Sequence, residues 1–340
     1  PMTMRQLLMR RLPQTLLVAV GVGLVAFFIT RLLPGDPAST WAGPRASREE
    51  LAQVSEELGL DLPLPEQAVR YLIGLASGDW GISIHTRQPV IEDVAGRLVA
   101  SLELVGVAMV IALVGGLFLG MIGARGKGRW PDWITSALTA VLVSAPIFWL
   151  GLLLQLTVAT ELDLLPVAGR YDRDYRDVVA EQGTTGLVML DAALRLNGPL
   201  LASAATHVLL PAMVVAAYPT GLIARLFRAS LIETLGEEHV RMARAIGFNE
   251  RTIIWRFALR SSLGPVLAAL ALVFGYALAN TFLVENLFDW PGLGSYVADS
   301  ITTLDAPSIA GATVVVALAY LLANLVVDLI RPLIDPRLRA

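Results

Sequence analysis

Long apolar segments separated by short polar stretches dominate the pattern of this sequence. Six of them have the length and hydrophobicity of membrane spans, at residues 12–33, 98–124, 133–160, 200–227, 263–287 and 309–330. A helix needs about 20 apolar residues to cross a hydrocarbon core of about 30 Å. Because lipid offers no hydrogen-bond partners, the backbone of such a segment must satisfy itself as a helix. We therefore expect an all-α polytopic membrane protein with six transmembrane helices.

The composition agrees with a membrane protein and argues against several kinds of chemistry. Hydrophobic residues make up 55% of the 340 residues and charged residues only 16%, against roughly a quarter in soluble domains. The mean hydropathy is +0.65. The chain has no cysteine and only three histidines, which lie far apart in the sequence. It therefore offers no disulfide framework and no Cys- or His-rich metal motif, and we expect neither a metal site nor catalytic residues.

The distribution of basic residues predicts the orientation in the membrane. Short cytoplasmic flanks of membrane spans carry an excess of Lys and Arg. Such residues gather before the first span, between the second and third, after the fourth and after the sixth: Arg5, Arg10, Arg11; Arg125, Lys127, Arg129; Arg228, Arg241, Arg244, Arg251, Arg256, Arg260; Arg331, Arg337, Arg339. Residues 261–330 contain none. We therefore place both termini in the cytoplasm and interpret the N-terminal segment as a retained span, not a cleaved signal peptide.

This orientation divides the chain into three regions. Residues 1–33 form an N-terminal tail and the first span, and residues 34–97 form an extracytoplasmic helical insertion. Residues 98–340 form a core domain of five spans, with an extracytoplasmic loop at 161–199 and a cytoplasmic loop at 234–260. The charged 161–199 loop has no strong hydrophobic period, so we expect it to be mobile or to contact a partner.

The insertion carries its own helix signals. Ser47, with Glu50 three residues later, predicts a capping box that satisfies two free N–H groups at a helix start. Gly59 is placed to end that helix. Pro65 suits the first turn of a second helix, and Gly78 is placed to follow it.

The cytoplasmic loop contains the most informative stretch. Glu238 lies in the first turn of a predicted short helix. Arg241 and Arg244 lie further along, and Gly247 follows. An acidic start, later basic residues and a final glycine match the helix dipole and a left-handed C-terminal cap. A second helix is expected to begin near Asn249.

The same short helix has the composition of a docking element. Ala243 and Ala245 are small, which would let a partner surface approach closely. Larger apolar side chains are expected to fill a hydrophobic groove on that partner, with the arginines as a charged rim. These apolar residues are Val240, Met242, Ile246 and Phe248. The alternative is a basic amphipathic helix that lies on the inner membrane face.

The stretch "EEHVRMARAIGFNERTIIWRFALRSS" resembles the EAA loop of membrane subunits in binding-protein-dependent ABC importers. The core positions of that loop are matched by Glu238, Ala243, Ala245 and Gly247. In the family this loop is the coupling helix, which inserts into a cleft on the ATPase subunit, so the resemblance implies an ATPase-coupling role that extends to Arg241 and Arg244. The general family pattern continues to Ile-x-Leu-Pro, whereas this chain has "FALR" at residues 257–260.

Further segments resemble the dipeptide/oligopeptide and nickel permease branch of that family. They include "RLLPGDPA", "SAPIFWLGLLL", "VENLFDWPGLGSY" and "NLVVDLIRPLIDPRLR", in the family's order. The resemblance implies the type I ABC importer permease fold, with 98–340 as the core permease domain, in a bacterial plasma membrane. It also implies half of a translocation pathway for di- or oligopeptides. Nickel chelates, glutathione or another small solute remain alternative cargoes.

The resemblance also implies a set of partners. They are a second related permease subunit, two ATPase subunits, membrane lipid, and an extracytoplasmic solute-binding protein that is a lipoprotein or periplasmic. Whether the second permease is a copy of this chain is left open by the sequence. No nucleic-acid partner is expected.

No sequence feature predicts nucleotide binding or catalysis by this chain itself. The stretch "GARGKGR" around Lys127 lacks the spacing and the Ser or Thr of a Walker A loop. ATP and Mg²⁺ are therefore expected on the partner ATPase subunits. We expect this chain itself to bind no cofactor. A remote alternative is an ATPase-independent secondary transporter or a receptor-like scaffold. A secondary transporter would need ionisable relays at mid-membrane or inverted repeats, and neither is found in the sequence.

Candidate path residues lie at the outer end of the fifth span. Asn280, Glu285 and Asn286 are expected to line the translocation path or its outer gate. Glu103, near the outer end of the second span, is expected to be wetted, with a role in translocation as the alternative.

The stretch "FDWPGLGSY" at residues 288–296 is interpreted as an external re-entrant wedge at the same gate. Trp290 suits the membrane interface. Pro291 and Gly292 suit the central positions of a type II turn, in which Gly292 takes a positive φ. Gly294 completes the candidate gate residues.

Overall fold

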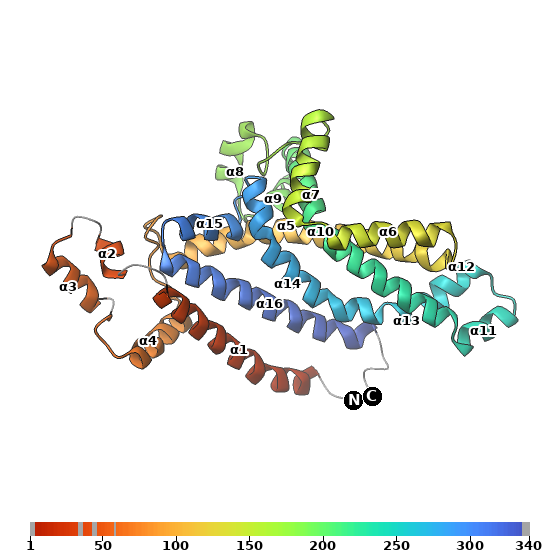
Figure 1. The fold of residues 1–340 in the computed structure, drawn as a ribbon, viewed down its shortest axis with the longest axis horizontal. Helices are drawn as coiled ribbons and strands as arrows, with labels where there is room; N and C mark the ends of the chain where they lie inside the picture. Colours follow the sequence, from red (N-terminus) through yellow and green to blue (C-terminus); the bar gives the residue numbers. More distant parts are fainter. Residues whose placement is uncertain (1–3, 33–36, 43–45, 58, 335–340) are drawn as a thin grey trace. The chain divides into compact units, whose positions relative to one another are not determined.

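Helices make up nearly all of the described structure. The computed structural model describes residues 4–32, 37–42, 46–57 and 59–334. The α-helices, shown in Figure 1, are α1 Met4–Leu32, α2 Pro37–Ala42, α3 Arg48–Glu57, α4 Leu64–Ser77, α5 Val90–Arg125, α6 Trp130–Ser144, α7 Ile147–Leu154, α8 Arg176–Gln182, α9 Val188–Leu194, α10 Gly198–Leu235, α11 Glu238–Ala245, α12 Glu250–Thr252, α13 Leu259–Ser262, α14 Gly264–Leu287, α15 Leu293–Thr302 and α16 Ala306–Ile334. Within these ranges, the β pairing is an isolated bridge between Ile82 and Pro89. The all-α prediction is confirmed.

Four helices are long and apolar enough to cross a membrane. They are α5, α10, α14 and the Ala306–Val327 part of α16. A bent pair, formed by α6 and the apolar helix over Ile147–Glu161, qualifies as a fifth candidate. The apolar part of α1, Thr15–Arg31, is shorter than these spans. The described residues therefore support four spans, or five when the bent pair is counted as one.

The predicted third span corresponds to a bent pair of helices, not to one straight helix. α6 ends at Ser144 and α7 begins at Ile147, with a bend of 107° between the two halves. Pro146 has no N–H to bond to the preceding turn. It also holds Ala145 extended, at φ −66° and ψ 129°, because proline disfavours the α region for the residue before it.

The described chain forms two compact units. The first contains the described parts of Pro1–Leu7, Leu102–Trp290 and Leu322–Ala340, and the second contains those of Leu8–Ser101 and Pro291–Leu321. Within the first unit, α10 packs against α6, α9 and α14, and Figure 1 shows α6 running beside α10.

Glycines bring α5 close to α10 in the first unit. A Cβ added to Gly116 would lie 2.6 Å from Cγ2 of Ile223. A Cβ added to Gly120 would lie 2.7 Å from the carbonyl oxygen of Ala224. Small residues of this kind allow membrane helices to pack with their backbones in near contact.

Replacing Gly120 with Ala is expected to destabilise the protein by about 1–3 kcal/mol, the usual cost of overpacking a tight contact. The obstructing oxygen belongs to the backbone of α10, so no side-chain rotation relieves the clash. Thermal unfolding of the purified chain in detergent measures the loss. Gly106→Ala is the matched control on α5, because a Cβ there meets nothing within 4 Å. Equal melting temperatures for the two variants would contradict the close contact.

The second unit confirms the helix signals of the insertion. The Ser47 N–H donates to Glu50 Oε2 at 2.7 Å, and the Glu50 N–H donates to Ser47 Oγ at 3.2 Å. These hydrogen bonds lower the pKa of the Glu50 carboxyl. α4 ends at Gly78, which has φ +86°, and Gly59 also has a positive φ, of 63°.

Helix α15 is packed into the second unit instead of projecting from it. Leu293 and Tyr296 of α15 join a buried cluster with Val90 and Val94 of α5 and Ala312 of α16. The wedge interpretation required contacts of this kind, and α15 makes them within its own unit. Its position at an external gate stays a prediction.

Candidate functional site

Helix α11 ends in the left-handed cap predicted from its sequence. Gly247 has φ +95°. The Phe248 N–H donates to the Ala243 carbonyl at 3.2 Å, and the Gly247 N–H donates to the Arg244 carbonyl at 3.1 Å. This pair of bonds is a Schellman motif. The predicted cap at Gly247 is confirmed, and it turns the chain sharply between α11 and α12.

An ion pair closes the same turn. Arg244 Nε and Nη2 donate to Glu250 Oε1 and Oε2 at 2.6 and 3.1 Å. These hydrogen bonds lower the pKa of the Glu250 carboxyl and raise that of Arg244. The Asn249 side chain accepts the Thr252 N–H at 2.8 Å, so the second helix begins where the sequence predicted. The loop is therefore a folded element with fixed ends.

The inner side of α11 packs against its own chain. Val240 and Ala243 are 0% and 3% exposed, and they form a buried cluster with Ile253. Leu235 and Phe257 pack against this cluster. The expectation that Val240 fills a partner's groove is therefore wrong. Ala243 is small because it packs inside the loop, not because a partner approaches it.

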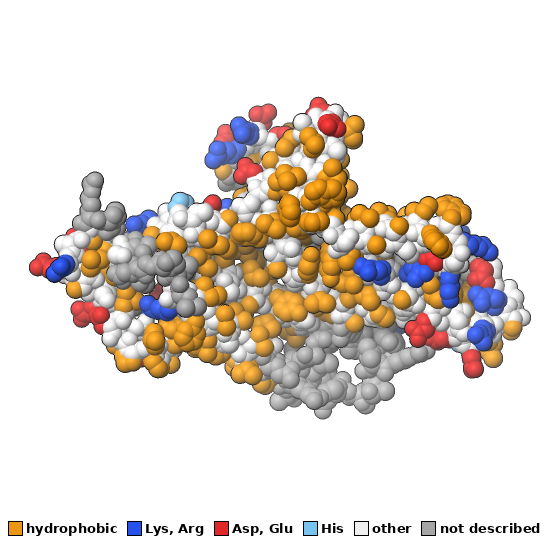
Figure 2. Space-filling model, viewed as in Figure 1, with side chains coloured by type: hydrophobic (Ala, Val, Ile, Leu, Met, Phe, Trp, Pro, Cys, Tyr) orange, Lys and Arg blue, Asp and Glu red, His pale blue; other side chains and the backbone are white. Residues whose placement is uncertain are grey.

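The outer side of α11 and the turn that follows it carry exposed apolar side chains, although the Phe248 ring packs against Phe257. Met242 and Ile246 are 69% and 71% exposed, and Phe248 is 39% exposed. Arg241 and Ala245 are also exposed. Figure 2 shows charged side chains of both signs gathered around α11 and α12, where Figure 1 places them beyond the end of α10. The exposed surface of this loop therefore consists of apolar residues surrounded by a charged rim.

At the other end of the first unit, a buried ion pair holds the loop at 161–199. Arg170 Nε and Nη2 donate to Glu103 Oε2 at 2.8 and 2.5 Å. The Met189 N–H donates to Glu103 Oε1 at 2.8 Å. The Glu103 side chain is 5% exposed and that of Arg170 is 13% exposed. The expectation that Glu103 is wetted is wrong, because its carboxylate anchors this loop.

Trp290 lies under the same guanidinium. Cζ of Arg170 is 5.7 Å from the Trp290 ring centre, within the range of a cation–π interaction. Trp290 is 1% exposed, so its expected place at the membrane interface is wrong. The Gly169 N–H donates to the Phe288 carbonyl at 2.8 Å. The loop at 161–199 is therefore attached to the chain that follows α14.

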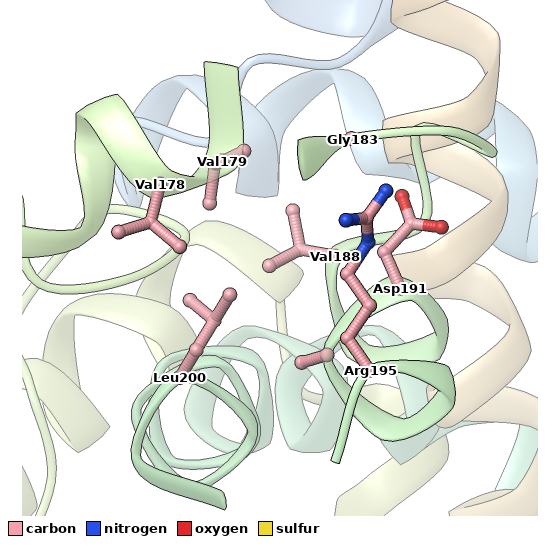
Figure 3. A pocket seen from close by; sticks show the side chains of 8 residues that line it. Val178, Val179, Gly183, Val188, Asp191, Arg195 and Leu200 are labelled. Atoms are coloured by element: carbon pink, nitrogen blue, oxygen red, sulfur yellow. The ribbon is translucent and has the colours of Figure 1, made fainter. Parts of the chain in front are cut away.

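The loop at 161–199 shares a small core with the start of α10. The buried residues are Val188, Ala192, Leu200 and Ala204. Figure 3 shows the shallow pocket beside them, which is lined by Val178, Val179, Gly183, Val188, Asp191, Ala192, Arg195 and Leu200. Burial raises the pKa of Asp191, but hydrogen bonds from Thr185 and Thr184 outweigh it and hold that pKa below its usual value. The loop is folded, and contact with a partner stays a prediction.

The polar residues predicted at the outer end of α14 do not share one surface. Glu285 is fully buried. The Asn280 side chain donates to the Tyr276 carbonyl at 2.9 Å, and that of Asn286 donates to the Phe282 carbonyl at 2.7 Å. Both amides thus bond to the preceding turn of their own helix.

The turn after Trp290 is not of the expected type. A type II turn needs a positive φ at its glycine, but Gly292 has φ −103° and ψ −169°. Asp289 takes the left-handed conformation instead, with φ 50°. Pro291 is exposed, whereas Gly292 and Gly294 are buried.

The sequence matches one family along almost its whole length. Residues 116–340 match the family described as "Binding-protein-dependent transport system inner membrane component". Residues 4–104 match the N-terminal family of the same membrane components. The chain belongs to this family. It is a permease subunit of a binding-protein-dependent ABC importer and a multi-pass protein of the bacterial inner membrane.

Curated permeases match this permease from end to end. The probable D,D-dipeptide transport system permease protein DdpB of Escherichia coli strain K12 is 40% identical over 337 residues, 99% of this chain and 98% of the relative. The dipeptide transport system permease protein DppB of the same strain is 36% identical over 99% of both chains. The glutathione transport system permease protein GsiC of Salmonella paratyphi A is 34% identical over 96% of this chain and 95% of its own. These relatives are permease subunits, not enzymes.

The sequence did not reveal the ion pairs of this permease. Arg228 was counted only as one of many basic cytoplasmic residues. In the structure its Nε and Nη2 donate to Asp132 Oδ1 and Oδ2 at 2.6 and 2.8 Å. Asp132 and Glu103 are each an isolated acidic residue beside or within an apolar segment. That pattern was the available signal for a buried ion pair. Nothing in one sequence identified which arginine each acid would meet.

Proposed function

We propose that this permease forms half of the translocation path of a type I importer for di- and oligopeptides. The names of DdpB and DppB support peptides as the solute class. The second half of the path belongs to a related permease subunit, and a solute-binding protein delivers the peptide on the outer side. The name of GsiC, which is 34% identical, supports glutathione as an alternative solute. Nickel chelates or another small solute are further alternatives.

The observation that carries the proposal is the outer surface of α11. A short, firmly capped helix presents Met242 and Ile246 to the outside, with Arg241 beside them. An exposed apolar surface with a charged rim suits insertion into a groove of a partner. In the importer that partner is one of two ATPase subunits, which hold ATP and Mg²⁺. Glu238, Ala243, Arg244, Ala245 and Gly247 complete the loop and keep its shape.

The proposed topology has six spans and cytoplasmic termini. It counts α1 as the first span and the bent pair of α6 and the following apolar helix as the third. The basic residues in the loop at 234–260 and the absence of Lys and Arg from 261–330 support this orientation. The outer gate then contains the end of α14 and the segment that follows it. Its residues are Asn280, Glu285, Asn286, Trp290, Pro291, Gly292 and Gly294.

Reconstitution with defined partners tests the proposal. Liposomes containing this permease, the second permease and both ATPase subunits are supplied with the binding protein and a radiolabelled dipeptide. Uptake is expected only with ATP and all subunits present, and excess unlabelled dipeptide should compete more strongly than glutathione. Uptake that persists without the ATPase subunits would contradict the ABC mechanism. Stronger competition by glutathione would contradict the peptide assignment alone.

A further inference from the structure

A polar cavity of about 230 Å³ lies between α5, α6 and α10 in the first unit. Hydroxyl-bearing residues of α6 line one side of it, and arginines of α10 line the other. The residues are Thr135, Ser136 and Thr139 opposite Arg225 and Arg228. Figure 2 shows basic side chains on the visible face where α6 and α10 run side by side.

The two arginines differ in how their charges are balanced. Arg228 uses Nε and Nη2 to bind Asp132, which leaves Nη1 outside the ion pair. Asp132 is 6% exposed and also accepts the Gly128 N–H at 3.0 Å. Arg225 is exposed and has no ion pair or hydrogen bond within the described ranges. The cavity therefore carries a net positive charge.

Two exposed tryptophans at the start of α6 indicate the depth of the cavity in the membrane. Trp130 and Trp133 in its first turn are each 74% exposed, and aromatic residues of this kind favour the headgroup level of a membrane. Leu138 and Val141 are 43% and 57% exposed, on the side of α6 away from the residues that line the cavity. Thr135 lies about 8 Å along the helix from Trp130. The cavity thus lies close to the headgroup level.

We propose that this cavity binds the phosphate of an anionic phospholipid, with Arg225 and Arg228 as its cationic ligands. Basic pockets between membrane helices on the cytoplasmic side suit such headgroups. A guanidinium binds phosphate through paired N–H donors. The inner-leaflet position rests on the orientation given in the proposed function.

Lipid retention by purified protein tests this site. The full chain, with the subunits that accompany it, is placed in nanodiscs of phosphatidylethanolamine and phosphatidylglycerol in equal amounts. Native mass spectrometry then counts the lipids kept after re-extraction into detergent. The wild type should prefer phosphatidylglycerol, and Arg225→Gln should reduce that preference about fivefold, the effect of roughly 1 kcal/mol per basic residue at an anionic surface.

Two control variants make the result specific. Arg225→Lys keeps the charge and should retain most of the preference. Arg256→Gln removes an exposed arginine of the coupling loop, outside the cavity, and should leave the preference unchanged. No loss in Arg225→Gln, or an equal loss in Arg256→Gln, would overturn the proposal.

A separate readout distinguishes lipid from transported solute. Loss of peptide uptake in Arg225→Gln with an unchanged lipid preference would overturn the lipid site and assign Arg225 to the solute path. Lipid retention is measured without solute and without ATP. Failure of the transport proposal would therefore leave the lipid result unaffected, and the two can be judged independently.

Discussion

Replacing Ile246 with Glu is expected to reduce ATP-driven uptake by a factor of about ten or more, while the chain still folds and inserts. Ile246 is 71% exposed, so the new carboxylate is hydrated in the isolated permease and harms no internal contact. In an apolar groove of the ATPase it would lose that hydration without a counter-charge, at a cost of several kcal/mol. A tenfold weakening needs only about 1.4 kcal/mol. Uptake and the amount of ATPase that co-purifies are the two measurements.

Variants of neighbouring positions sharpen this test. Met242→Glu should behave like Ile246→Glu, because Met242 is 69% exposed on α11, one turn before Ile246. Ile246→Leu keeps the apolar surface and should transport normally. Ala243→Glu is a poor probe, since Ala243 is 3% exposed and a charge there would disrupt the loop itself. Normal uptake with normal ATPase retention in both Glu variants would refute the docking surface.

Replacing Arg170 with Met is expected to lower the free energy of unfolding by about 3–5 kcal/mol, the usual cost of removing one partner of a buried ion pair. The variant leaves the Glu103 carboxylate, 5% exposed, without its main counter-charge. It also removes the cation above the Trp290 ring. The thermal midpoint of the detergent-purified permease and its yield in membranes measure the loss.

The double variant Glu103→Leu/Arg170→Met is the control for this prediction. It removes both charges, and replacing a buried ion pair by apolar residues is often neutral or stabilising. The double variant should therefore be more stable than Arg170→Met alone. If the double variant is as unstable as the single one, the loss comes from packing and the unpaired carboxylate is not its cause.

Features fixed by neighbours in the sequence were predictable. The capping box of Ser47 and Glu50 and the left-handed cap at Gly247 depend on residues within a few positions, and both are present. The long apolar helices were also predictable, because length and hydrophobicity alone define a candidate span. The 107° break at Pro146 was missed, since an uninterrupted apolar run was given more weight than the proline within it.

Contacts between distant segments could not be deduced. Glu103 and Arg170 are 67 positions apart, and Asp132 and Arg228 are 96 apart. Each acid had many arginines as possible partners, and only the packing of helices selects one. The burial of Trp290 had the same cause, because the guanidinium and loop that cover it come from a segment with no helical period.

The two sides of α11 were also ambiguous in the sequence. Apolar residues occur nearly all around this eight-residue helix, so periodicity did not separate an inner side from an outer one. Ile253, which lies beyond the Gly247 cap, covers Val240 and Ala243 and leaves Met242 and Ile246 exposed. The docking residues therefore became clear only when the fold of the whole loop was known.

Helix α14 connects the loop that carries α11 to the segment that holds the loop at 161–199. It is a single helix of 24 residues, about 36 Å long, and it begins directly after the loop that carries α11 to α13. At its far end, Phe288 and Trp290 hold Gly169 and Arg170 of the loop at 161–199. If nucleotide on the ATPase changes the affinity of the outer surface for the binding protein, binding must change the nucleotide affinity by the same factor. Docking of a loaded binding protein is then itself an allosteric effector of the ATPase, with no separate sensor required.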